Sequence, residues 1–130
     1  MTQPPKFSGR PLIAKLGFIP GDKIFVADTP GWYSKFADEN DLDLVPSLPA
    51  THAHIFCNSK NVLIDFLADS DLDGVEKSIW FCWPKRSSSA RTNVVEQVFR
   101  DAMLPLGWID VKVAAMDEIW SGLKFLRRKN

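Results

Sequence analysis

Cysteine and histidine are scarce in this sequence of 130 residues, which has two of each. The absence of a C-x-x-C spacing argues against a redox pair, and a chain of this length needs no disulfide or metal staple for folding. Cys57 and Cys82 lie in apolar stretches, so we predict two buried free thiols in a reducing compartment, the cytoplasm. His52 and His54 share one face of a predicted strand, but no third ligand accompanies them, and we predict no metal site.

Excess charge and long apolar runs are also missing. The 16 basic residues balance the 16 acidic ones, which argues against a dedicated nucleic-acid-binding protein. No apolar run approaches the roughly 18 residues of a membrane span, and residues 1–6 lack the apolar core of a signal peptide. We therefore expect neither nucleic acid nor a membrane as a partner.

The neutral total hides an uneven distribution along the chain. Residues 28–76 carry a net charge of −8, whereas residues 77–130 carry +5. Such an asymmetry can orient a ligand or a partner, or it can reflect two solvated faces of different composition.

Apolar periodicity predicts a single domain over residues 10–130, preceded by a flexible arm over residues 1–9. Strands and helices alternate, which predicts a Rossmann-like three-layer α/β sandwich of about five strands, mostly parallel with a terminal antiparallel strand. The expected helices cover residues 10–17, 31–37, 62–67 and 94–103, and the expected strands residues 23–28, 54–58, 78–83, 109–115 and 123–128.

Two phrases in the second half of the chain resemble those of a known fold. Residues 79–85 are similar to the strand and Pro-Lys turn before the penultimate helix of class I methyltransferases, and residues 106–111 to the step into their terminal hairpin. Residues 83–88 and 117–129 resemble a small bacterial family of unknown function, domain of unknown function three-thousand-fifty-two. The resemblances imply a compact α/β protein with a reduced methyltransferase-like topology, and the family supplies no activity.

The sequence departs from the methyltransferase pattern where the cofactor would bind. In that fold the first strand leads into a Gly-rich loop, and an acid at the end of the next strand holds the ribose. Here the first predicted strand leads into Asp28-Thr29-Pro30-Gly31-Trp32, and no strand ending in an acid is evident between residues 33 and 50. A dinucleotide fingerprint and a P-loop are absent too. We therefore predict no cofactor, S-adenosylmethionine included.

Ligands of open parallel sheets bind beyond the carboxyl ends of the strands, an edge that we call the rim. Residues 28–32, 58–60, 83–92 and 116–122 are expected to meet there. Their hydroxyl groups, cationic side chains and aromatic rings are suited to a small anionic ligand. The candidate ligand-binding residues are Thr29, Asn58, Trp83, Lys85, Arg86, Ser87, Ser88, Arg91, Trp120 and Ser121.

Groups capable of catalysis are few, because no nucleophile elbow occurs and neither histidine is expected near a rim serine. Asp117, Lys85 and Asp28 are the candidates for acid–base work. The leading hypothesis is a non-catalytic or vestigial methyltransferase-like domain that binds a small anion or a protein partner at the rim. The alternatives are a small transferase or hydrolase that uses Asp117 and Lys85, and a module that forms a homodimer through its terminal antiparallel strand, taken as the sheet edge.

Overall fold

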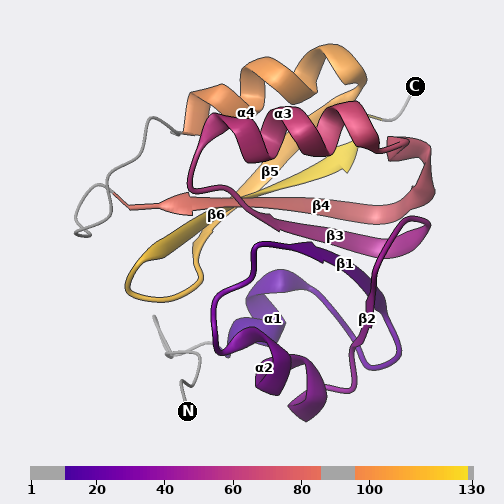
Figure 1. Cartoon of the computed structure of the whole chain (residues 1–130), viewed down its shortest axis with the longest axis vertical. Coiled ribbons are helices and arrows are strands. Elements are labelled where there is room, and N and C mark those ends of the chain that lie inside the picture. The colour runs from indigo at the N-terminus through magenta and orange to yellow at the C-terminus, as the bar shows by residue number, and fades with distance from the viewer. Residues whose placement is uncertain (1–10, 86–95, 129–130) are drawn as a thin grey trace.

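The computed structural model describes residues 11–85 and 96–128, which form one six-stranded sheet with helices on both faces (Figure 1). The expected arm at residues 1–9, most of the expected loop at residues 84–92 and the expected start of the following helix lie outside the described residues. The strand order is β2-β1-β3-β4-β6-β5. The strands are β1 (Lys23–Ala27), β2 (Asp43–Val45), β3 (Ala50–Phe56), β4 (Val75–Pro84), β5 (Trp108–Ala115) and β6 (Trp120–Arg127).

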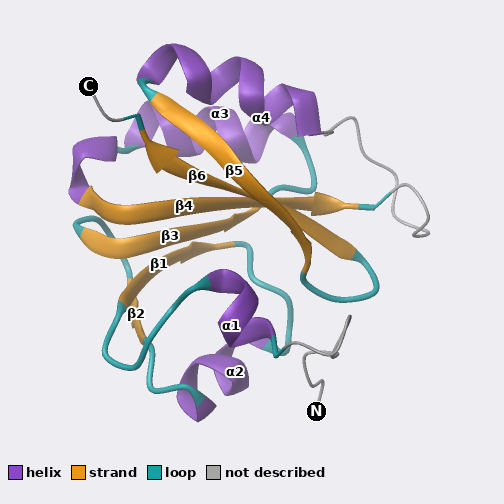
Figure 2. Cartoon of the chain, turned by 180° about the vertical axis from the view of Figure 1, so that it is seen from behind, coloured by secondary structure: helices purple, strands orange, loops and turns teal. Residues whose placement is uncertain are grey.

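The described helices cover both faces of the sheet, as Figure 2 shows from behind. The lower face in both views packs against α1 (Leu12–Leu16) and α2 (Tyr33–Glu39). The opposite face packs against α3 (Lys60–Asp69) and α4 (Glu96–Met103). Short 3₁₀ turns, Leu72–Gly74 and Leu104–Leu106, lead into β4 and β5. The three-layer sandwich predicted from the sequence is thus the observed architecture.

The sheet is parallel from β2 to β4, and β6 is antiparallel to both of its neighbours. The prediction of a mostly parallel sheet with a terminal antiparallel strand is confirmed. The strand count is six rather than about five, because Asp43–Val45 forms a parallel strand beside β1 within a segment that we expected to contain none. This strand of three residues ends at Val45 and Pro46, so no acid stands at its carboxyl end.

Two apolar clusters hold the layers together, one on each face of the sheet. β3 and β4 contribute to both, which explains why their residues are buried almost continuously rather than at every second position. The two cysteines illustrate the arrangement. Cys57 N–H donates to the carbonyl of Cys82, yet the Cys57 side chain belongs to the α3/α4 cluster and that of Cys82 to the α1/α2 cluster. Both are free, so the predicted buried thiols are confirmed.

The edge of the sheet differs from the one expected for the dimer hypothesis. The terminal strand β6 lies between β4 and β5, so β5 forms the edge. Arg127, at the end of β6, stacks its guanidinium on Trp108 of β5 at 4.7 Å and binds Asp73. β5 carries half-exposed Val111, and its register shifts at this point between Asp110 and Lys112. Such an irregularity is one way in which proteins limit edge-to-edge pairing, and homodimer formation stays a prediction.

Among the described residues, no helix has the length and apolar character needed to cross a membrane.

Candidate functional site

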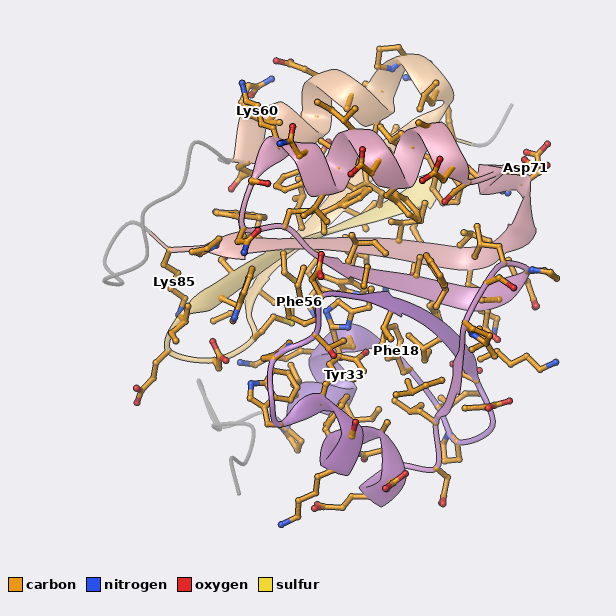
Figure 3. All side chains as sticks on the ribbon, viewed as in Figure 1. Phe18, Tyr33, Phe56, Lys60, Asp71 and Lys85 are labelled. Carbon is orange, nitrogen blue, oxygen red and sulfur yellow. The ribbon has the colours of Figure 1, made fainter. Side chains whose placement is uncertain are left out.

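The carboxyl ends of the parallel strands and the turn between β5 and β6 meet at the rim, as predicted. Lys85, which follows β4, donates its backbone N–H to the carbonyl of Ile119 in that turn at 2.8 Å. Figure 3 shows Lys60 and Lys85 on the side of the rim and Asp71 at the opposite end of the strands. The strand order changes direction between β1 and β3, since β2 lies beyond β1 and β4 lies beyond β3. In open α/β sheets the ligand crevice lies at such a switch point.

Trp32 is packed at the switch point of the sheet. It follows the loop after β1 and precedes α2, and its side chain is only 2% exposed. Its ring stacks on Tyr33, with centroids 5.6 Å apart, and contacts Phe36 and Phe56 edge to face. Phe56 is at the carboxyl end of β3 and contacts Trp120 of β6 in the same edge-to-face manner. Side chains from both sides of the switch point therefore close the space between them.

Asp117 joins this aromatic cluster to the β5–β6 turn. Its Oδ2 accepts a hydrogen bond of 2.8 Å from the indole N–H of Trp32. Its Oδ1 accepts the backbone N–H groups of Ile119 and Trp120, at 2.8 and 2.6 Å. The carboxylate is thus held by three N–H donors and is 8% exposed. This is a turn-forming role, because local acceptors of this kind fix the backbone of tight turns.

Lys85 lies next to Asp117, as the enzyme hypothesis required, but it does not bind the carboxylate. Its ammonium group donates to the backbone carbonyl of Asp117 at 2.7 Å. Both oxygens of Asp117 accept other donors, so the pair does not present a base and an acid to a shared substrate. The geometry gives no support to the transferase or hydrolase alternative.

The other candidates occupy different surroundings. Asp28, Thr29 and Asn58 are exposed at the rim, and Asp28 adopts a left-handed backbone conformation with φ 53°. Trp83 is buried among the core residues, 5.4 Å from the ring of Phe99, and therefore does not face the rim. Trp120 and Ser121 are half-buried at the start of β6. The remaining four candidates, Arg86, Ser87, Ser88 and Arg91, lie outside the described residues.

A buried polar network lies between the sheet and the layer of α1 and α2, next to Trp32. The Tyr33 hydroxyl is 2.7 Å from His54 Nδ1, and His54 Nε2 is 3.2 Å from Cys82 Sγ. Burial, together with nearby His52, lowers the pKa of His54 to about 3. Burial likewise raises the pKa values of Tyr33 and Cys82. All three groups are therefore neutral at pH 7, which makes this network a structural element rather than an acid–base site.

A second buried network was not expected from the sequence. His52 Nδ1 lies 2.5 Å from Ser78 Oγ, and His52 Nε2 lies 3.1 Å from Asp22 Oδ2. These are the residue types of a hydrolase triad. However, all three are buried, and they lie toward the amino ends of the strands, away from the rim. The contacts span 26 and 30 positions, so only the known sheet register could have paired them.

Several solved structures of methyltransferases are similar to this chain in fold. A SAM dependent methyltransferase from Aquifex aeolicus is similar over 89% of this chain and 87% of its own, with 8% identity and a TM-score of 0.60. A ribosomal protein L11 methylase from Lactobacillus delbrueckii subsp. bulgaricus is similar over 91% of this chain and 75% of its own, with 11% identity and a TM-score of 0.52. A magnesium protoporphyrin IX methyltransferase from Synechocystis PCC 6803, solved with bound SAM, is similar over 89% of this chain and 74% of its own, with 12% identity and a TM-score of 0.50.

At these identities the likeness shows the fold alone, and it confirms the distant resemblance to class I methyltransferases. No protein-family model matches the chain, so the resemblance to the small bacterial family of unknown function is not supported. No curated protein matches the chain either.

Proposed function

We propose that this chain is a methyltransferase-like domain that does not transfer methyl groups and instead binds a small anionic ligand at its rim. The observation that carries the proposal is the closed switch point. The loop after β1 contains one glycine, Gly31, and the indole of Trp32 that follows it is buried and hydrogen-bonded to Asp117 at the switch point, where a cofactor would lie. The acid that would hold a ribose is also missing from the end of β2. The residues present therefore do not fit S-adenosylmethionine.

Cationic and amide groups at the rim support an anion as the ligand. Lys60 and Asn58 are exposed beside the carboxyl end of β3, and Lys85 follows β4. In the sequence, Arg86 follows Lys85 directly and Arg91 comes six positions after it. Guanidinium and ammonium groups are the usual partners of phosphate and carboxylate ligands.

Calorimetry on the purified chain tests both parts of the proposal. Titration with S-adenosylmethionine is expected to give no heat of binding, whereas inorganic phosphate or ATP is expected to bind and to raise the melting temperature. The double variant Arg86→Ala/Arg91→Ala should lose this binding, and rising salt should weaken it in the wild type.

Arg128→Ala is the matched control, because Arg128 is an exposed cation after β6 and therefore lies at the opposite edge of the sheet. This variant should bind the anion as the wild type does. Binding of S-adenosylmethionine by the wild type would overturn the non-methylating assignment. Equal anion binding by both variants would overturn the rim site.

A further inference from the structure

We propose that a cleft at the amino ends of the parallel strands binds a free α-amino acid, with the carboxylate of the ligand facing Lys23 and its ammonium group facing Glu76 and Asp73. The cleft lies at the end of the sheet opposite the rim, on the side where Figure 3 shows Asp71. The inference goes beyond the proposed function and does not depend on it.

The cleft is a cavity of about 410 Å³ between the starts of β1, β3 and β4. Small-molecule sites are typically cavities of roughly 300–1,000 Å³ in which a few polar groups fix the orientation of the ligand. A free amino acid suits the lower end of this range. Charged, hydroxyl-bearing and small apolar residues together line the cavity: Lys23, Pro49, Ala50, Thr51, Asp73, Gly74 and Glu76.

Close packing fixes the wall that the 3₁₀ turn before β4 contributes to the cleft. An added Cβ at Gly74 would lie 3.1 Å from Leu48 Cβ, so the turn approaches the segment before β3 as closely as a glycine allows. Leu48 in turn packs against the α3/α4 cluster. The guanidinium of Arg127 donates to the carbonyls of Leu72 and Val75, on both sides of Gly74. The cavity is therefore formed before any ligand arrives, which lowers the cost of ordering on binding.

Opposite charges stand on the two sides of the cleft. Lys23 begins β1, Glu76 lies near the start of β4, and Thr51 of β3 lies between them and accepts the backbone N–H of Lys23 at 2.9 Å. Neighbouring strands are about 4.8 Å apart, so β1 and β4 are separated by roughly 10 Å. Within the described residues, neither the ammonium of Lys23 nor the carboxylate of Glu76 forms a hydrogen bond or an ion pair, although Asp43 is the register partner of Lys23 on β2.

This arrangement selects a ligand that carries both charges. Asp73 adds a second carboxylate beside Glu76, and its Oδ1 is shared with Arg127 at 3.1 Å. A simple anion would meet these carboxylates and a simple cation would meet Lys23, so like-charge repulsion disfavours each of them. An α-amino acid carries an ammonium and a carboxylate group on one carbon, and both can form charge-assisted hydrogen bonds with the side chains that flank the cleft.

Calorimetric titration of the wild-type chain with L-alanine, L-leucine and L-phenylalanine tests the proposal. At least one of these probes is expected to bind and to raise the melting temperature. Its N-acetyl derivative lacks the ammonium group and its amide lacks the carboxylate, so each derivative should bind at least tenfold more weakly. No binding of any of the three amino acids would overturn the proposal, as would equal affinity for the amino acid and its two derivatives.

Single-charge variants locate the site. Lys23→Gln and Glu76→Gln change exposed side chains, so both variants should fold, and each should bind the amino acid at least tenfold more weakly than the wild type. Lys77→Gln is the matched control, because Lys77 is an exposed neighbour of Glu76 that does not line the cleft, and this variant should bind as the wild type does. Undiminished binding by both Lys23→Gln and Glu76→Gln would place the ligand elsewhere and refute the site. Phosphate titrations of the wild type remain the separate test of the rim.

Discussion

The buried imidazole of His54 predicts that the protein loses much of its stability in mild acid. The folded pKa of His54 is about 3, against an ordinary value of 6.5. Below pH 6.5 the unfolded chain therefore binds a proton that the folded chain does not, so stability falls as the pH decreases from 6.5 toward 3. With about 1.36 kcal/mol per pKa unit, the loss reaches about 2 kcal/mol at pH 5 and about 4 kcal/mol at pH 3, where the folded-state group is itself half protonated. A domain with a total stability of about 5–15 kcal/mol is strongly affected by such a loss.

Urea unfolding at pH 7, 6 and 5, followed by fluorescence, measures this dependence directly. The control variant is His54→Asn, because its amide can still meet the Tyr33 hydroxyl but cannot titrate. This variant will be less stable than the wild type at pH 7, yet its stability should fall less between pH 7 and pH 5. His52, whose pKa burial also lowers, remains in the variant and accounts for a residual slope. Parallel slopes for the two proteins would refute the assignment of His54 as a buried neutral group.

Three further predictions concern packing and reactivity. Gly122→Ala should destabilise the protein by about 1–3 kcal/mol in urea unfolding, because the new Cβ would lie 2.7 Å from Met116 Cε and 3.1 Å from Cys82 Sγ. The control variant Gly31→Ala has open space around the new Cβ and should change stability by less than about 0.5 kcal/mol. Iodoacetamide at pH 8 should leave Cys57 and Cys82 unmodified in the native protein and label both after denaturation, since burial raises the pKa of Cys57 to about 12 and holds the pKa of Cys82 well above its ordinary value. Native labelling detected by mass spectrometry would contradict this. Arg127→Ala should lower the melting temperature more than Arg128→Ala, because Arg127 alone of the two stacks on Trp108 and binds the carbonyls of Leu72 and Val75; equal shifts would show that these contacts add little.

The sequence predicted the central elements of the fold because local apolar patterns determine them. The run from Ile79 to Trp83 required burial on both faces, and β4 has it. β2 escaped prediction because its three residues lie between acidic and Pro-rich stretches and form a strand only through pairing with β1. The position of β6 inside the sheet is likewise set by long-range pairing rather than by any local signal.

The candidate site was predicted in position but not in chemistry. The rule for open sheets correctly brought Lys85 and Asp117 to one rim, where they are joined. The role of Asp117 depends on Trp32, a partner 85 positions away, and no pattern in the sequence links the two. The prediction that Trp83 binds a ligand at the rim was wrong, because a residue at a strand end next to the rim can still direct its side chain into the core.

The interior position of β6 has a consequence for how the protein is made. The amino end of a chain emerges from the ribosome first, and β6 comes last among the described strands. Until it emerges, one side of β4 has no partner and β5 has no neighbour in the sheet at all, since β6 pairs with both. The nascent chain can assemble β2, β1, β3 and β4 early, but it must keep an unfinished edge until residue 127 has left the exit tunnel. During that interval the apolar stretch of β4 is the segment that a chaperone would need to protect.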